Sequence, residues 1–160
     1  MQKALSVTKP SDREIEITRV FDAPRKLVFD AFTKPDLVKR WLLGPPGWAM
    51  PVCKIDAKVG GKFRYGWRNE NDGREMGVSG AFRELTPPDR IVHTEIFDED
   101  WTGGETVVTT LFKEQGGKTT VLMTVLYGSE KARDGALGSG MTRGMEDSYA
   151  RLDAMLAAKS

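Results

Sequence analysis

The stretch SGMTRGMEDSYARLDAMLAA, residues 139–158, decides the fold of this chain. It contains no proline, and its apolar side chains recur three and four residues apart, which predicts one long amphipathic helix. The face consists of Met141, Met145, Ser148, Leu152 and Met155, with Tyr149 and Leu156 beside it. Such a helix must bury this face against another element. Met145 lies midway along the face, so Met145→Asp is expected to loosen or unfold the domain.

The chain before this helix supplies strands that could cover it. Glycine and proline pairs such as Gly60-Gly61, Pro87-Pro88 and Gly116-Gly117 mark turns. The stretches between these turns are rich in β-forming residues and predict six strands. These strands are expected at residues 52–59, 62–68, 76–85, 91–97, 106–112 and 119–127.

The second of these stretches, KFRYGWR at residues 62–68, alternates aromatic and cationic side chains. Successive side chains of a strand point to opposite faces of the sheet. We therefore expect the aromatic set to face the helix and the cationic set to face solvent, because the opposite arrangement would bury the cations. The aromatic set is Phe63, Tyr65 and Trp67, and the cationic set is Lys62, Arg64 and Arg68.

The N-terminal part completes the element order. Residues 13–21 alternate apolar and polar side chains and predict a first strand, and Pro24 and Pro35 each introduce a short helix. Residues 1–12 are expected to be a flexible tail. The order is one strand, two helices, six strands and one long helix, in a single domain at residues 13–158. The predicted fold class is therefore α+β, with a curved antiparallel sheet wrapped around the long C-terminal helix.

Composition excludes several classes of protein. The 160 residues include 24 Lys and Arg and 23 Asp and Glu, a net charge of +1, so neither nucleic acid nor a membrane is expected as a partner. Met1–Arg13 lacks the apolar region of a secretory signal, and no apolar run approaches the roughly 20 residues that span a bilayer. Cys53 is the only cysteine, which favours a reducing compartment. We expect a cytoplasmic protein.

An ordered set of motifs carries a family likeness. The set is EITRVFDAP at residues 16–24, PDL at 35–37, RW at 40–41, GP at 44–45, GGKF at 60–63, PPDRIV at 87–92, and the Gly-Met pairs at 140–141 and 144–145. Over roughly residues 13–157 the chain resembles the AHSA1-like family, the relatives of the activator of Hsp90 ATPase, within the Bet v 1/START-like (SRPBCC) superfamily. The resemblance implies a helix-grip fold.

A bent sheet that grips one helix leaves space between them unless large side chains fill it. Aromatic and methionine side chains suit the wall of a small-molecule pocket. The predicted ligand-binding residues are Trp41, Trp48, Phe63, Tyr65, Trp67, His93, Phe97, Met141, Met145 and Tyr149. The alternative, that these side chains pack together as a solid core, stays open. Gly140 and Gly144 are expected to let the helix approach the sheet closely or to permit an unusual helix start.

Catalytic candidates are few. His93 is the only histidine, and it shares a strand face with Glu95, so the two could act as an acid–base pair. A single histidine in a strand is more often structural, and we assign no further catalytic residue. The sequence has no cluster of His and Cys residues, so no metal site is predicted. No cofactor is expected. The acidic residues 98–100 are typical of a solvated turn. Arg19 stays open as an anchor for a ligand carboxylate.

Three functional hypotheses follow. The leading one is non-catalytic binding of a small apolar or amphipathic molecule between the sheet and the C-terminal helix. The second is an enzyme that acts on a hydrophobic substrate through His93 and Glu95. The third, implied by the resemblance, is a co-chaperone-like domain that binds a protein partner. The chain is expected to be a monomer or a homodimer.

Overall fold

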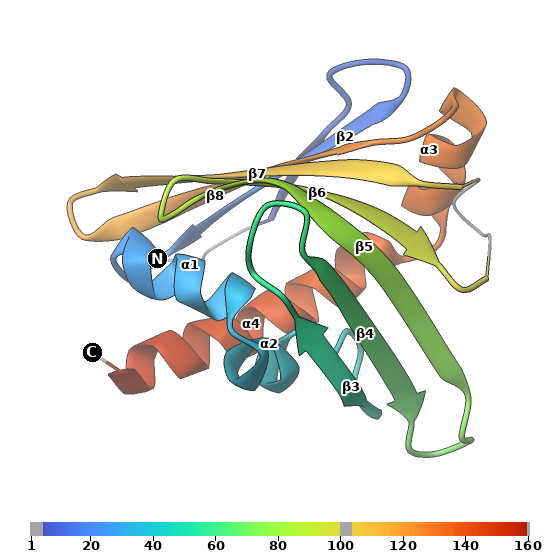
Figure 1. Ribbon diagram of the computed structural model, residues 1–160, viewed down its shortest axis with the longest axis horizontal. Coiled ribbons are helices and arrows are strands. Elements are labelled where there is room, and N and C mark those ends of the chain that lie inside the picture. The colour runs from blue at the N-terminus through green and yellow to red at the C-terminus, as the bar shows by residue number, and fades with distance from the viewer. Residues whose placement is uncertain (1–4, 100–103, 160) are drawn as a thin grey trace.

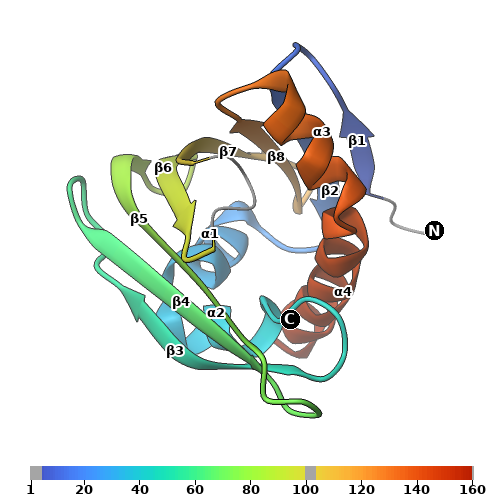
Figure 2. The ribbon, with the colours of Figure 1, turned by 90° about the vertical axis from the view of Figure 1, so that its right-hand side faces the viewer.

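The computed structural model describes residues 5–99 and 104–159. In this part of the chain, an eight-stranded antiparallel sheet with the order β1-β2-β8-β7-β6-β5-β4-β3 curls around a long C-terminal helix (Figures 1 and 2). The strands are β1 Ser6–Thr8, β2 Glu14–Phe21, β3 Trp48–Ile55, β4 Lys62–Asn69, β5 Glu75–Thr86, β6 Arg90–Phe97, β7 Thr106–Gln115 and β8 Lys118–Leu126; the helices are α1 Arg25–Thr33, α2 Pro35–Trp41, α3 Glu130–Gly138 and α4 Met141–Lys159. The predicted α+β helix-grip fold is confirmed.

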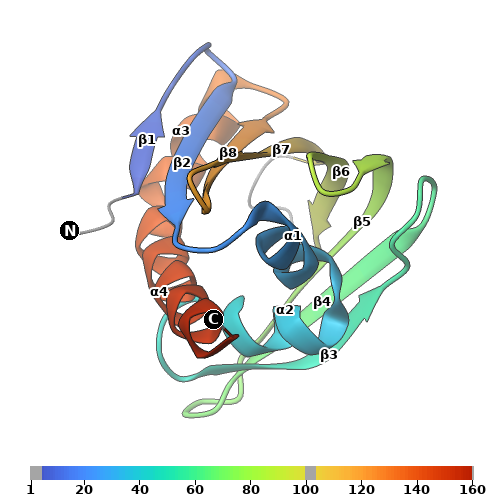
Figure 3. The same cartoon turned by 90° about the vertical axis from the view of Figure 1, so that its left-hand side faces the viewer.

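The curvature of the sheet has identifiable local causes. The pairing of β3 with β4 shifts between Ala49 and Val52, and the pairing of β5 with β6 shifts between Phe82 and Glu84. Bulges of this kind bend a strand and increase its twist. Helices α1 and α2 lie at one end of the curled sheet (Figure 3), and α4 crosses its concave side.

The strand predicted at residues 52–59 is displaced in the structure. Strand β3 begins at Trp48 and ends at Ile55. The following residues form a tight turn, in which the Lys58 amide donates to the Asp56 carbonyl at 2.9 Å and the Gly61 amide donates to the Lys58 carbonyl at 2.8 Å. Valine at position 59, which suggested a continuing strand, is 65% exposed.

The prediction of a flexible tail over residues 1–12 is wrong for residues 6–8. Ser6–Thr8 form strand β1, which pairs with β2 through Ser6↔Thr18 and Thr8↔Glu16. The segment is too short to show a hydrophobic period, and only tertiary pairing makes it a strand. Residues 1–4 of the predicted tail lie outside the described residues.

The C-terminal region contains a helix that the sequence interpretation missed. Helix α3 begins after Ser129, whose Oγ accepts a hydrogen bond from the Ala132 amide at 3.1 Å, and this capping serine was the available signal. Gly135 and Gly138 lower the helix propensity of the segment and concealed it. Gly140, with φ +84°, separates α3 from α4, so the expectation of an unusual helix start applies to this glycine.

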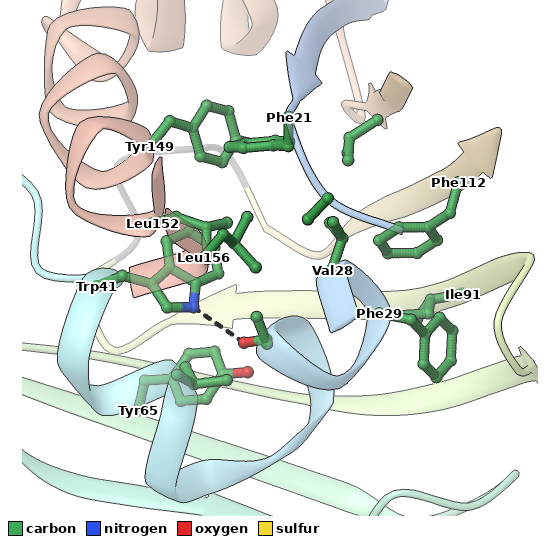
Figure 4. Close-up of a cluster of buried hydrophobic side chains, with 14 of the residues drawn as sticks. Phe21, Val28, Phe29, Trp41, Tyr65, Ile91, Phe112, Tyr149, Leu152 and Leu156 are labelled. Carbon is green, nitrogen blue, oxygen red and sulfur yellow. Dashed lines mark hydrogen bonds between the residues drawn. The ribbon is translucent and has the colours of Figure 1, made fainter. Parts of the chain in front are cut away.

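The main core lies against the C-terminal half of α4. Tyr149, Leu152 and Leu156 pack with Phe21 and Trp41 in one buried cluster (Figure 4). The indole of Trp41 is almost wholly buried, and its Nε1 donates to the Ala31 carbonyl at 2.9 Å. This hydrogen bond satisfies the polar end of a large core side chain.

Met145 is only partly buried and packs at the edge of the main core and of a second buried cluster, which contains Ile15, Ile17 and Val108. The position that dominates the helix face is instead Leu152, whose side chain is fully buried. A substitution that tests the packing of this helix is therefore better placed at Leu152 than at Met145, where Met145→Asp was expected to loosen or unfold the domain.

An ion pair fixes α4 to the sheet. Arg19 of β2 points inward, and its Nη1 lies 3.0 Å from Oδ1 of Asp153 on α4. Its guanidinium also lies over the Phe21 ring, 4.8 Å from the centroid. The guanidinium of Arg19 is thus paired with Asp153 of α4. This pairing argues against the alternative that Arg19 anchors a ligand carboxylate.

Candidate functional site

A cavity of about 950 Å³ lies between the sheet and the N-terminal half of α4. Small-molecule sites typically measure about 300–1,000 Å³, so this cavity is at the large end of the range. The residues predicted to bind ligand all line it: Trp41, Trp48, Phe63, Tyr65, Trp67, His93, Phe97, Met141, Met145 and Tyr149. Their role in binding remains a prediction. Trp41 and Tyr149 belong mainly to the core, because each is 2% exposed or less.

Aromatic rings of β4 form one wall. The ring centroids of Phe63 and Tyr65 lie 4.9 Å apart, and those of Tyr65 and Trp67 lie 6.0 Å apart. The Trp67 indole donates from Nε1 to the Leu42 carbonyl at 2.8 Å, which fixes its orientation. The wall is therefore a row of rings with a defined geometry rather than a set of mobile side chains.

The predicted alternation along β4 is confirmed. The aromatic set faces the cavity, whereas Lys62 and Arg68 are exposed. Arg64 lies on the outer face, where its Nη1 contacts Asp98 Oδ1 at 2.6 Å and Ser79 Oγ at 3.0 Å. This pairing holds the pKa of the Asp98 carboxyl below its usual value through the hydrogen bond from Arg64.

The loop between α2 and β3 lies against α4 at the rim of the cavity. The Gly44 amide donates to Ser148 Oγ at 2.9 Å. A Cβ at Gly144 would lie 3.5 Å from Cδ of Pro45, an ordinary van der Waals distance. Gly144 therefore faces this loop, not the sheet, so its expected close packing involves a different partner.

Sequence reasoning missed the contribution of β7 and β8. Inward residues of both strands line the cavity: Thr106, Val108 and Thr110 of β7, and Met123 and Val125 of β8, followed by Tyr127. Their two-residue spacing was the available signal. They were missed because β-branched side chains on a strand are equally consistent with ordinary core.

The cavity contains the predicted polar pair. His93 Nε2 and Glu95 Oε2 lie 3.1 Å apart, with side chains 16% and 27% exposed. The ring of Phe63 meets the imidazole edge-on, at a centroid distance of 5.3 Å. His93 Nδ1 is buried and has no hydrogen-bond partner among the described residues. The imidazole is therefore held by aromatic packing and by Glu95.

Phenol groups complete the polar lining. Burial, followed by the negative charge of Glu95, raises the pKa of Tyr127 to about 12. Burial is also the main cause that raises the pKa of Tyr65, with smaller contributions from Cys53 and Glu95. Burial raises the pKa of Tyr149, which Arg19 partly opposes. At neutral pH all of these phenols are uncharged.

The tyrosines predict a specific alkaline transition. A phenol with a raised pKa holds its proton more tightly in the folded state, so its contribution to stability is complete below the ordinary pKa of about 10 and is lost at higher pH. We expect tyrosinate absorbance to rise only well above pH 10, together with unfolding seen by circular dichroism. Ionisation near pH 10 with an intact fold would contradict this burial.

Within residues 5–99 and 104–159, no three His, Cys, Asp or Glu side chains lie close enough to hold a metal ion. No helix in these ranges combines the length and hydrophobicity needed to cross a membrane.

The Cys53 thiol donates to the Pro35 carbonyl at 3.6 Å, and burial raises the pKa of this thiol. Asp100 of the acidic stretch lies outside the described residues.

A curved antiparallel sheet that encloses a cavity with one C-terminal helix defines the helix-grip class of the Bet v 1/START-like (SRPBCC) superfamily. Within this class the chain belongs to the AHSA1-like family, because the family described as Activator of Hsp90 ATPase homolog 1-like protein matches residues 22–157. None of the curated proteins compared with the chain matches it.

Solved structures agree with this assignment. A crystal structure of a Rhodobacter sphaeroides protein is 35% identical with a TM-score of 0.90, over 97% of this chain and 99% of that chain. A solution structure from Arthrobacter aurescens is 25% identical with a TM-score of 0.84, over 96% and 91% of the two chains. An AHSA1-like protein from Aeromonas hydrophila, 20% identical over 88% and 93% with a TM-score of 0.69, shares the fold.

Proposed function

We propose that this protein binds a small apolar or amphipathic molecule in the cavity between the sheet and α4, without converting it chemically. The observation that carries the proposal is the cavity itself, about 950 Å³ with a predominantly apolar lining. The rings of Phe63, Tyr65 and Trp67 supply flat apolar contact area along one wall. His93 and Glu95 supply a polar end inside the same space.

Burial of apolar ligand surface would drive binding. A ligand that buries roughly 300 Å² of apolar area gains about 7 kcal/mol at roughly 25 cal/mol per Å², before the cost of immobilisation is subtracted. Micromolar affinity corresponds to a net gain of about 8 kcal/mol, so it requires a ligand that buries considerably more apolar area than this. Met141 and Met145 line the helix side of the cavity, and methionine side chains can adapt to irregular ligands.

The test starts from the protein as it is made in cells. Native purification and mass spectrometry should identify a co-purifying small molecule, and a thermal-shift screen of apolar carbonyl and aromatic compounds should find further ligands. Met145→Trp should then weaken binding of these compounds at least tenfold, because the indole occupies part of the cavity. Val59→Trp is the matched control, since Val59 is 65% exposed. Unchanged binding to Met145→Trp would place the ligand elsewhere.

A second candidate function, an enzyme, is favoured by one observation: the 3.1 Å pair of His93 and Glu95 lies within the cavity. General acid–base assistance is worth about 10²–10⁴ in turnover. We expect ligands to be recovered unchanged from the wild type, as judged by mass spectrometry after long incubation. Conversion by the wild type, lost in His93→Gln while binding persists, would establish the enzyme instead. A co-chaperone role is supported by the family description alone.

A further inference from the structure

We infer that the polar end of the ligand is a hydrogen-bond donor, and preferably a protonated amine, that pairs with the Glu95 carboxylate. This inference rests on the proposed function, since it concerns the occupant of the same cavity. It narrows the expected ligands from apolar or amphipathic molecules in general to apolar amines and, with weaker binding, apolar alcohols. Fatty acids and other apolar carboxylates are disfavoured.

The balance of charge in the cavity carries the argument. Among the described lining residues, the charged side chains are Arg64, Glu75, Glu95, Asp98 and Glu99, with His93 as the titratable base. The guanidinium of Arg64 is bonded to Asp98 on the outer face of the sheet. Arg64, the one lysine or arginine among the described lining residues, is thus already paired with Asp98, so an anionic ligand would meet Glu95 without a compensating cation, and burying like charges together is unfavourable.

The hydrogen bond between His93 and Glu95 leaves the Glu95 carboxylate able to accept a further hydrogen bond. A carboxylate only accepts hydrogen bonds, so the hydrogen in the 3.1 Å contact belongs to His93 Nε2. His93 Nδ1 is buried without a partner among the described residues, so the contact with Glu95 is the one side-chain hydrogen bond of the ring that the structure shows. This single hydrogen bond leaves the other lone pairs of the Glu95 carboxylate available to a donor on the ligand.

The surroundings of Glu95 fit an organic cation. Phe97 lies two residues along β6 on the same face as Glu95, and both line the cavity. The rings of Tyr65 and Trp67 lie on the neighbouring wall. Aromatic faces attract ammonium groups, and this attraction strengthens when water is excluded. Carboxylate and rings together provide one charge-assisted hydrogen bond and several favourable ring contacts for an amine.

The test compares three ligands of one shape: naphthylmethylamine, naphthylmethanol and naphthoate. Titration calorimetry on the wild type should show the amine binding at least tenfold more tightly than the carboxylate. Glu95→Gln should weaken the amine by about ten- to a hundredfold, as expected for a lost charge-assisted hydrogen bond, and should leave the alcohol within about threefold. Glu75→Gln is the matched control, because Glu75 is an exposed rim residue that pairs with Arg68.

Each outcome decides a different point. Equal wild-type affinities for the three ligands, or tightest binding of naphthoate, would overturn the amine preference while leaving the cavity proposal intact. Binding of none of the three would count against the proposed function itself, and the inference would fail with it. If Glu95→Gln does not fold, the wild-type ranking alone still decides the inference. If Glu95→Gln and Glu75→Gln weaken amine binding equally, the loss comes from the general negative potential of the cavity, and the proposed pairing of the amine with Glu95 is overturned.

Discussion

Leu152→Ala is expected to lower the free energy of unfolding by about 2–5 kcal/mol, the usual cost of removing a fully buried leucine side chain. Leu152 is 0% exposed and packs in the same cluster as Trp41, Tyr149 and Leu156. The surrounding rings are fixed by edge-to-face contacts, including Phe21 with Tyr149 at 5.2 Å. They cannot collapse easily into the space left behind, so the cost should lie in the upper part of the range.

Met145→Ala is the matched control on the same helix. Met145 is partly buried and lines the cavity, so its truncation enlarges an existing space and should cost only about 1 kcal/mol. Denaturant unfolding followed by circular dichroism measures both values. Equal losses for Leu152→Ala and Met145→Ala would show that α4 is packed uniformly along its length.

The different costs expected at Leu152 and Met145 follow from the different surroundings of the two halves of α4. Its C-terminal half, with Leu152 and Leu156, secures the fold, and Asp153 adds an ion pair with Arg19 of β2. Its N-terminal half, with Met141 and Met145, borders the cavity instead. Mutations for ligand specificity can therefore be placed in the N-terminal half with little risk to the fold.

The sequence predicted the parts of the structure that depend on periodicity. The two-residue alternation in β4 is sufficient to orient the rings of Phe63, Tyr65 and Trp67, because the opposite register would bury cations. The three- and four-residue spacing after residue 139 is sufficient to identify α4. Elements without a clear period, such as β1 at Ser6–Thr8 and the glycine-containing α3, depend on tertiary contacts and could not be read in this way.

The candidate site was predictable in its residue types but not in its dimensions. Alternation placed His93 and Glu95 on one face, and the structure has them 3.1 Å apart. The size of the cavity depends on bulges near Ala49 and Phe82, which follow from the path of the whole sheet. Arg19 illustrates the same limit, because its partner Asp153 is far away in the sequence.

Gly80 shows how one missing side chain shapes the wall. It lies in β5 opposite Phe63 of β4, and the Phe63 ring extends across it to meet His93 edge-on at 5.3 Å. The backbone of Gly80 does not have a positive φ, so an alanine would be compatible with its conformation. A Cβ there would nevertheless overlap the Thr94 carbonyl oxygen and lie 2.5 Å from Cε2 of Phe63.

Gly80→Ala is therefore expected to destabilise the protein by about 3 kcal/mol, the upper end of typical overpacking costs, because a backbone carbonyl cannot move aside as a flexible side chain can. The displaced Phe63 ring should also weaken ligand binding at least tenfold in calorimetry. Gly135→Ala is the control of opposite sign: Gly135 is an exposed residue inside α3 with open space around it, so alanine should stabilise by about 0.5–1 kcal/mol. Unchanged stability and affinity in Gly80→Ala would mean that the Phe63 ring does not depend on the space above Gly80.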